Sequence, residues 1–500
     1  MITRPKLSDW QIIGFYTGKI MVGIGLMMLL PLIVGMFFRE WSAVVDFVIG
    51  ISIALTIGHG FQVICRKRRE MTWMHGLVTA AFSWLVAMVV GAVPHYLSGH
   101  FGSFFDASFD LMSGITTTGL YLLQDLDHIS YSLNMWRHLL TYVGGQGIVV
   151  VALTFLIRGS AGAFMMYVGE GKDEKLLPNV IQTARAIWIV SLTYMVLGTI
   201  LLTTANLYEG MAFTRAFLQG WWLFMGSWST GGFAPQSLNV LYYHSLLIEL
   251  LTMTLFIIGS FNFALHWAVW TGNRREVYRN IEIMSFVTTL FIMVTLGSYA
   301  LLRIDAMRGT AALFRKGFYQ IVSAHTGTGL TNMFPGQFAD DWGATAMLAV
   351  IIAMALGGSA ASTAGGFKAM RVGIIARSFV AEIRRLMSPE SAVLVEKIHH
   401  IKDRYLSDKQ IQASMMIVLS FILIYLGGGI IGSLYGYPFI DALFESVSAG
   451  ATVGLSSGVT SPGMPTGLKA YFMFVMWIGR LEFIAVFALV GFIVRVARGK

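Results

Sequence analysis

Four short segments carry the residue types that could coordinate a cation, and each holds a glycine-bearing tetrapeptide. In chain order these read TTGL at 117–120, TGGF at 230–233, GTGL at 327–330 and TVGL at 452–455. Main-chain carbonyl oxygens can replace the hydration shell of a monovalent cation when several such segments face one axis. Glycine suits this role, because a backbone whose carbonyls all face one axis needs φ values that a side chain penalises. The chemistry indicated is coordination of a dehydrated cation.

The four segments share a register that extends beyond the tetrapeptides. The key glycines are Gly119, Gly232, Gly329 and Gly454. Fifteen positions earlier each segment has a phenylalanine, ten positions earlier an aromatic residue and seven positions earlier an aliphatic one. Taking Gly231 instead of Gly232 breaks this match. A single tetrapeptide could be an ordinary turn, but four in one register predict equivalent units, each with a short re-entrant helix before its glycine.

The candidate cation ligands are the residues that lead up to each key glycine. They are Thr116, Thr117, Thr118, Gly119, Ser229, Thr230, Gly231, Gly232, Thr326, Gly327, Thr328, Gly329, Ala451, Thr452, Val453 and Gly454. The third segment departs from the others, since Gly327 stands where they have threonine. Whether the third segment coordinates the cation is therefore left open.

The composition predicts the elements that must hold these segments. Of 500 residues, 56% are hydrophobic and 12% are charged, whereas about 25% are charged in an ordinary soluble domain. We therefore expect an all-α polytopic membrane protein, whose first apolar run lacks a small-residue cleavage site and is retained. Stretches near the ~20 residues needed to cross a bilayer lie at 11–37, 43–64, 73–93, 136–157, 184–204, 240–270, 281–302, 344–377, 411–434 and 469–496.

These ten spans group into two extra helices followed by four repeats of helix, pore helix and helix. The extra helices occupy 1–70, and the repeats occupy 71–175, 176–279, 280–405 and 406–500. Their candidate cation segments are 116–120, 229–233, 326–330 and 451–455. Each repeat starts and ends on the same side of the membrane, so the four segments can face one pore.

The basic residues indicate the orientation. Clusters follow the even-numbered spans, at 66–69, 172–175, 274–279, 384–404 and 495–500, while Arg4 and Lys6 precede the first. The positive-inside rule places both termini and all clusters in the cytoplasm. The net charge of +9 is thus mainly a topology signal, with a cytoplasmic partner or anionic lipid as secondary uses. Nucleic acid is not an expected partner, and His399 and His400 are expected to be solvated.

Two features lie apart from the glycine segments. The run GGSAASTAGGF at 357–367, followed by Lys368, interrupts the eighth span, because glycines and small hydroxyl residues disfavour helix. A close-packing face between helices is the alternative. The tenth span contains Arg480 and Glu482 deep in apolar surroundings. Such an arginine is expected to face a pore or a carboxylate, with an interhelical salt bridge as the alternative.

Acidic residues on the short helices allow two interpretations. Asp106, Asp110, Asp441 and Glu445 could draw cations to the entrance, or could cap helices and pair with neighbours. The sequence does not decide between these roles. No constellation of nucleophile, base and orienting residue is present, so we expect no enzymatic activity.

On these motifs the whole chain resembles the Trk/Ktr/HKT superfamily of cation transporters, and most closely its bacterial Trk-type branch. The resemblance implies a pseudo-fourfold pore for K⁺ in the bacterial inner membrane, homodimer formation, and a cytoplasmic nucleotide-binding subunit of the RCK type. It also implies a gate formed by the 357–368 loop and Arg480, with gate residues Gly357, Gly358, Ser359, Ser362, Thr363, Gly365, Gly366 and Lys368. The chain itself has no GxxxxGK[ST] motif, and no organic cofactor is expected.

Two other functions remain open. A sodium-conducting or sodium- or proton-coupled member of the superfamily is one, although its usual mark, a serine in place of Gly119, is absent. A secondary symporter with discontinuous helices is the other, since the broken eighth span would suit it. The sequence leaves open whether transport is passive or coupled.

Overall fold

The computed structural model describes residues 7–65, 71–123, 125–148, 150, 153, 161–170, 179–304, 309–334, 336–389 and 395–498. Up to the middle of the chain, the helices are α1 (Leu7–Met27), α2 (Leu29–Phe38), α3 (Trp41–Ile64), α4 (Trp73–Leu97), α5 (Phe104–Ile115), α6 (Tyr131–Gln146), α8 (Ala161–Gly169), α9 (Val180–Tyr208), α10 (Phe213–Trp228), η1 (Asn239–Tyr243), α11 (Leu246–Gly259) and α12 (Phe263–Trp270). The remaining helices are α13 (Glu276–Arg279), α14 (Ile281–Arg303), α15 (Thr310–Ala312), η2 (Leu313–Phe318), α16 (Tyr319–His325), α17 (Gln337–Asp341), α18 (Gly343–Leu356), α19 (Ala369–Leu386), α20 (Asp408–Leu434), α21 (Phe439–Gly450), α22 (Thr466–Leu481) and α23 (Ile484–Ala497).

The prediction of an all-α polytopic membrane protein is confirmed. Among the described residues, six helices are long and apolar enough to cross a membrane, or eight if each of two bent pairs is one span. The count of ten stays a prediction. The expected span 136–157 runs beyond the described part of α6, and the expected span 344–377 is interrupted between α18 and α19.

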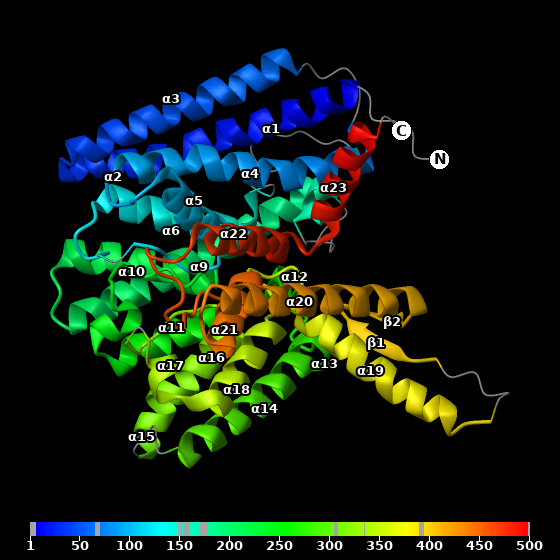
Figure 1. Ribbon diagram of the computed structural model, residues 1–500. Helices are drawn as coiled ribbons and strands as arrows, with labels where there is room; N and C mark the ends of the chain where they lie inside the picture. Colours follow the sequence, from blue (N-terminus) through cyan, green and yellow to red (C-terminus); the bar gives the residue numbers. More distant parts are fainter. Residues whose placement is uncertain are drawn as a thin grey trace.

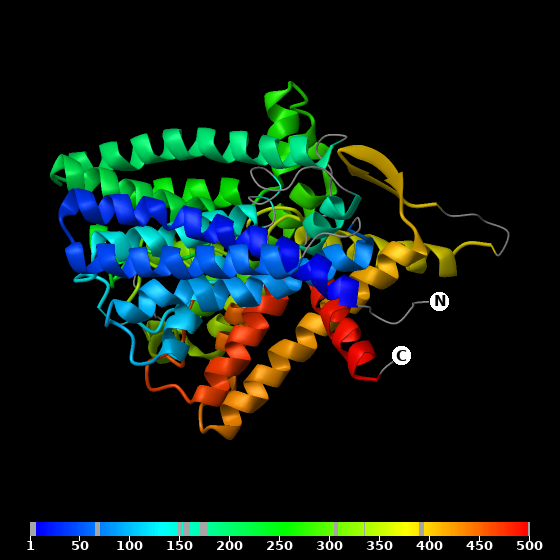
Figure 2. The ribbon, with the colours of Figure 1, turned by 90° about the horizontal axis from the view of Figure 1, so that it is seen from above.

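The helices are arranged as layers, with the N-terminal helices on one side (Figure 1). In this view α1, α3 and α4 form the blue upper layer, and α14, α16, α18 and α21 lie in the lower half. The antiparallel hairpin of β1 (Lys397–His400) and β2 (Lys402–Tyr405) projects with α19 at one end of the molecule. The start of α1 and the end of α23 lie at this same end in the orthogonal view (Figure 2), where the rings of Trp10 and Phe492 are 4.9 Å apart.

Some of the basic clusters lie within the residues that the structure describes. Those at 274–279 and 384–404 border the projecting hairpin, and Arg495 and Arg498 end α23. The basic residues at 4–6, 66–69 and 172–175, and Lys500, lie outside the described residues. The described clusters therefore gather at one end of the molecule.

Four short helical segments lie ahead of the key glycines, and their register agrees with the sequence pattern. They are α5, α10, the run α15–η2–α16 and α21. The aromatic residue ten positions before each key glycine is buried, with exposures of 0–2% at Phe109, Trp222, Tyr319 and Phe444. The third run contains a π-helical stretch over Leu313–Phe318, which the register does not predict. Apolar residues at helical spacing thus anchor each short helix in the core.

Two spans expected to be continuous are broken. Helices α11 and α12 meet at 95°, and α22 and α23 meet at 113°. At the first break, Asn262 Oδ1 accepts the N–H of Ala264 at 2.8 Å and begins a new helix. At the second, Glu482 and Phe483 have φ values of 51° and 69°. The expectation that Glu482 lies within an uninterrupted apolar helix is therefore wrong.

Candidate cation ring and loop

The four key glycines meet around one axis in cyclic order. A Cβ built on Gly119 would lie 2.7 Å from Gly231 O, and one built on Gly232 would lie 2.6 Å from Thr328 O. A Cβ on Gly329 would collide with Val453 O, and one on Gly454 would collide with Thr118 O. Each segment thus packs main chain to main chain against the next, and the last closes on the first. We call residues 116–119, 229–232, 326–329 and 451–454 the ring.

The backbone makes the same turn in every quarter of the ring. Each short helix ends four residues before its key glycine, at Ile115, Trp228, His325 and Gly450. The second and third residues after this end donate their N–H groups back to the helix. In the first quarter, Thr117 N donates to Gly114 O at 3.0 Å and Thr118 N donates to Ser113 O at 2.8 Å. The other three quarters repeat both bonds. This pair of bonds is the Schellman C-cap, which needs a left-handed residue at its second position.

The departure in the third segment has a conformational reason. The left-handed position is Thr117 with φ 59°, Thr230 with φ 48°, Thr452 with φ 53° and Gly327 with φ 73°. A β-branched residue at positive φ is strained, whereas glycine is not. Gly327 therefore keeps the backbone path of its quarter and lacks only the side chain. The key glycines also have positive φ, from 67° at Gly232 to 95° at Gly454, whereas Gly231 does not.

Hydroxyl groups brace two opposite quarters of the ring in the same way. Thr116 Oγ1 lies 2.8 Å from Thr118 Oγ1, and Thr326 Oγ1 lies 2.8 Å from Thr328 Oγ1. The second quarter has Ser229 Oγ 3.4 Å from Thr141 Oγ1 of α6. All candidate ligands with side chains are fully buried. Beyond the glycines, a cavity of about 390 Å³ opens outward and is lined by Gly119, Gly329 and Gly454 among others.

The 357–368 loop lies against the opposite side of the ring. Thr363 Oγ1 contacts Thr230 Oγ1 at 2.9 Å and donates to Gly259 O at 2.9 Å. A Cβ on Gly365 would strike Thr452 Oγ1 and Ala451 O, so the loop main chain touches the fourth quarter too. The loop is closed at its base, where Phe367 N donates to Ala355 O at 2.8 Å and Lys368 N to Leu356 O at 3.1 Å. The predicted interruption of the eighth span is thus a folded loop under the ring.

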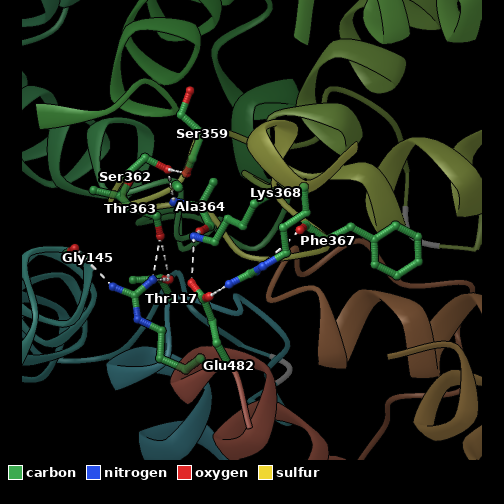
Figure 3. A network of polar contacts seen from close by, with 12 residues as sticks. Thr117, Gly145, Ser359, Ser362, Thr363, Ala364, Phe367, Lys368 and Glu482 are labelled. Carbon is green, nitrogen blue, oxygen red and sulfur yellow. Dashed lines mark hydrogen bonds and ion pairs between the residues drawn. The ribbon is translucent and has the colours of Figure 1, made fainter. Parts of the chain in front are cut away.

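Charged side chains fix the loop to the tenth span (Figure 3). Arg480 donates to Thr363 O at 2.6 Å and to Gly145 O of α6 at 3.0 Å. Lys368 bonds Ala364 O within the loop and lies 3.6 Å from Glu482. Glu482 also pairs with Arg371 of α19. Arg480 and Glu482 do not act as one pair, because the break at Glu482 turns its carboxylate toward α19.

A second set of contacts anchors the loop from the other side. Ser359 N donates to Ser260 O at 2.9 Å, at the break between α11 and α12. Ala360 N donates to Glu282 Oε1 in the first turn of α14 at 2.8 Å. Glu282 is buried, and its Oε2 accepts from Asn262 at 3.4 Å. The breaks in the sixth, eighth and tenth spans therefore meet under the ring.

The acidic residues of the first and last short helices mostly serve structure. Asp110 is fully buried, and its Oδ2 accepts from Arg137 Nε at 3.2 Å and contacts His95 Nε2 at 3.1 Å. Asp106 pairs with Lys469 at 2.6 Å. Glu445 accepts from Ser456 at 2.5 Å and from Thr460 N at 2.7 Å. Pairing and capping thus account for these three residues.

Several contact residues of the loop were not expected from sequence. Glu282 and Asn262 show no motif, although the polar residues Ser260 and Asn262 inside an apolar stretch are a signal for a break. His400 is buried against Asn280 Oδ1 at 3.1 Å, so the expectation that it is solvated is wrong. The contacts of these residues are made with partners that lie far away in the sequence, so a local pattern does not reveal them.

The chain is similar over nearly its whole length to known cation transport proteins. The family described as TrkH, cation transport protein, matches residues 44–495. An uncharacterized cation transporter of Methanocaldococcus jannaschii is 28% identical over 98% of this chain and 97% of its own length. The Trk system potassium uptake protein TrkH of Halomonas elongata is 27% identical over 94% and 96%. The crystal structure of the potassium transporter TrkH from Vibrio parahaemolyticus matches with a TM-score of 0.80 at 23% identity, over 96% of this chain and 98% of that one.

Proposed function

Since the chain belongs to the TrkH family of cation transport proteins, we propose that it takes up K⁺ across the cytoplasmic membrane through the ring. Relatives similar over nearly the whole chain are named as potassium uptake proteins. The ion sheds water against main-chain oxygens of the four quarters and leaves past the 357–368 loop. The ring residues are proposed to form the selectivity filter.

The observation that carries this proposal is the closed cyclic contact of the four glycine segments. A carbonyl ring discriminates between cations only if its oxygens surround one lumen. Each key glycine lies where a Cβ would collide with the main chain of the next segment, so the quarters hold one another at a fixed spacing. The short helices also point their C-terminal ends at this axis, and these ends carry partial negative charge that favours a cation.

The loop and Arg480 are proposed to form the gate. The guanidinium of Arg480 and the ammonium of Lys368 are both buried, and Glu482 lies 3.6 Å from Lys368. A cation that leaves the ring must pass these charges at short range in a medium of low dielectric, which raises the barrier to its movement. Opening then requires that the contacts of Arg480 with Thr363 O, Gly144 O and Gly145 O break.

The cytoplasmic end is proposed to be the end that carries the β1–β2 hairpin and α19, with both termini inside. A homodimer and a cytoplasmic RCK-type nucleotide-binding subunit, as the family resemblance implies, complete the proposal. The test of the partner is co-purification of the membrane protein with its cytoplasmic subunit, with and without added nucleotide.

The test of the function is ion flux in proteoliposomes. Entry of K⁺, Rb⁺, Na⁺ and Li⁺ is compared, with and without a proton gradient. We expect K⁺ and Rb⁺ to pass and Na⁺ and Li⁺ to pass more slowly, because the ring spacing is held by backbone contacts. Equal passage of all four ions would remove the filter assignment, and a strict need for a proton or sodium gradient would establish a coupled transporter.

The matched variant is Gly232→Ser. Gly232 has φ 67° and its Cβ would lie 2.6 Å from Thr328 O, so a serine must move one quarter relative to another. We expect folded protein that passes Na⁺ nearly as well as K⁺. Intact discrimination in this variant would contradict the assignment of Gly232 to the ring.

A further inference from the structure

A basic cavity lies at the base of the hairpin, which projects at one end of the molecule (Figure 1). It encloses about 210 Å³ between the start of α14, α19 and the hairpin. Its lining includes Arg279, Arg377, Lys397, His399 and Asp403. Three of these side chains are cationic at neutral pH, and Asp403 is the single acidic one. The cavity therefore has a surplus of positive charge.

The lining arginines differ from their neighbours on the same face. Arg384 pairs with Glu396 at 3.0 Å, and Arg385 lies 3.9 Å from Glu382. Within the described part of the chain, the side chains of Arg279 and Arg377 have no ion pair or hydrogen bond. Two unpaired guanidinium groups that line one cavity from different helices can bind a tetrahedral anion with several N–H donors each.

The only carboxylate in the lining is already neutralised. Asp403 Oδ2 lies 2.7 Å from Lys397 Nζ, and its Oδ1 lies 2.6 Å from His399 Nδ1. These contacts hold the pKa of Asp403 low, at about 2, and raise the pKa of His399 above its ordinary value. An anion that enters therefore meets Arg279 and Arg377 without repulsion by a free carboxylate.

We propose that this cavity binds a phosphate group, supplied either by the headgroup of an anionic lipid or by a free phosphate. The group bridges Arg377 of α19 to Arg279 at the end of α13, with Lys397 of β1 as a third donor. All three lie on different elements, so occupancy links α19, α13 and the hairpin.

The cavity is connected to the 357–368 loop by a short chain of contacts. His399 Nε2 lies 2.9 Å from Glu276 Oε1, which docks the hairpin on α13. His400 contacts Asn280 Oδ1 at 3.1 Å, and the same oxygen accepts Glu282 N at 3.0 Å. Glu282 then holds Ala360 N of the loop. The chain runs from the hairpin to the loop through buried groups.

The expected direction of the effect follows from this chain. Helix α19 begins directly after Lys368, so a bridge from Arg377 to Arg279 holds α19 in the position where the loop lies under the ring. A bound phosphate group should therefore slow K⁺ flux. This effect on flux rests on the proposed function, whereas the binding itself does not.

The test measures binding and flux separately on the full-length protein. Binding of radiolabelled inorganic phosphate is measured in nanodiscs of phosphatidylcholine alone and of phosphatidylcholine with phosphatidylglycerol. We expect saturable binding in the first, and a loss of about tenfold or more in affinity in Arg279→Gln/Arg377→Gln, since each charged hydrogen bond contributes strongly. Lower phosphate binding by the wild type in the second nanodiscs would identify the lipid headgroup as the source. Equal binding in both would identify free phosphate.

The matched control is Arg274→Gln/Arg275→Gln, which removes the same charge from exposed arginines that do not line the cavity. It should bind phosphate as the wild type does, and Arg377→Lys should retain part of the affinity. The inference is overturned if the cavity variant and the control bind equally, or if neither the wild type in phosphatidylcholine nor any variant shows saturable binding. Phosphate binding without K⁺ flux would instead refute the proposed function and leave the binding site standing.

Discussion

Arg480 donates to the main-chain oxygen of Thr363 at 2.6 Å, which joins the end of α22 to the loop beneath the ring. The same guanidinium reaches Gly145 O of α6 at 3.0 Å and Thr117 Oγ1 at 3.4 Å. One side chain thus joins α22 to the 357–368 loop, to α6 and to the first quarter of the ring. Planar guanidinium is suited to this task, because it offers five N–H donors in a fixed geometry.

Arg480→Ala should raise K⁺ flux in proteoliposomes. The change removes a buried positive charge from the exit of the ring and frees the loop from α6. Arg480→Lys should give a smaller increase, because it keeps the charge but loses the fork of donors. Arg495→Ala, a change at the far end of α23, is the control and should leave flux unchanged. Wild-type flux in folded Arg480→Ala would rule out the gate role.

Gly329→Ala should abolish discrimination between K⁺ and Na⁺. Its φ is 77°, and a Cβ there would collide with Val453 O of the next quarter. Gly436→Ala separates strain from collision, since Gly436 has φ 93° but no atom within 4 Å of its Cβ position. Flux ratios of the two variants provide the measurement. A wild-type ratio in folded Gly329→Ala would contradict the role of this ring contact in selectivity.

Thr230→Gly and Thr452→Gly should differ, although they make the same change at equivalent positions. Both relieve a threonine at positive φ, which costs about 1–3 kcal/mol. Thr230 Oγ1 contacts Thr363 Oγ1 at 2.9 Å, whereas Thr452 Oγ1 touches the loop at Gly365 but has no hydrogen-bond partner among the described atoms. Thr230→Gly should therefore loosen the loop and raise K⁺ flux, and Thr452→Gly should not. Flux assays at equal protein density distinguish them, and equal flux would contradict the contact.

Asp110→Asn should destabilise the protein by about 3–5 kcal/mol, the typical loss when one member of a buried ion pair is removed. The change leaves Arg137 buried beside Phe233, with its guanidinium carbon 4.2 Å from the ring centre. Thermal unfolding in detergent measures the effect. Asp125→Asn, in an exposed pair with His128, should leave the melting temperature unchanged. Similar melting of both variants would show that the buried pair does not stabilise the fold.

The hairpin should be held most firmly at mildly acidic pH. Contacts with Asp403 and Glu276 raise the pKa of His399 above 6.5, so its contribution is full below that value and is lost as pH rises through the raised pKa. The pKa of Asp403 is lowered to about 2 from 3.8, so its contribution fades only below 3.8. Arg279 also faces His399 and opposes its protonation.

Hydrogen exchange of the β1–β2 amides tests this pH dependence. Protection factors, corrected for intrinsic exchange, should fall between pH 5.5 and pH 8.5 in the wild type and stay level in His399→Gln, since the ordinary pKa of histidine lies near 6.5. A fall of the same size in His399→Gln would assign the pH dependence to another group.

The sequence predicted the helical class, the family and the register of the short helices, because these depend on local patterns. Apolar residues at fixed offsets bury Phe109 and Phe444 in equivalent places, and glycine at a left-handed position is readable from one residue. The interruption at 357–367 was also readable, because eleven consecutive residues lack a large aliphatic side chain.

The breaks at 260–262 and 482–483 were not predicted, because they are stabilised by distant partners. Glu482 leaves the helix of Arg480 to meet Lys368 and Arg371. Glu282 looks like an ordinary acidic residue in the first turn of a helix, and only the folded chain brings Ala360 N to it. Pattern and propensity carry no information about such long-range polar contacts.

The missing side chain of Gly327 makes room for the loop. A Cβ there would lie 3.4 Å from Ala364 Cβ, so the loop also contacts the ring at the quarter where no threonine projects. In a ring of four identical segments, no one segment differs from the others, so no side of the ring is favoured for contact with a loop. The loss of symmetry at this one residue suits the proposed gate, which is a single segment that lies off the axis of the ring.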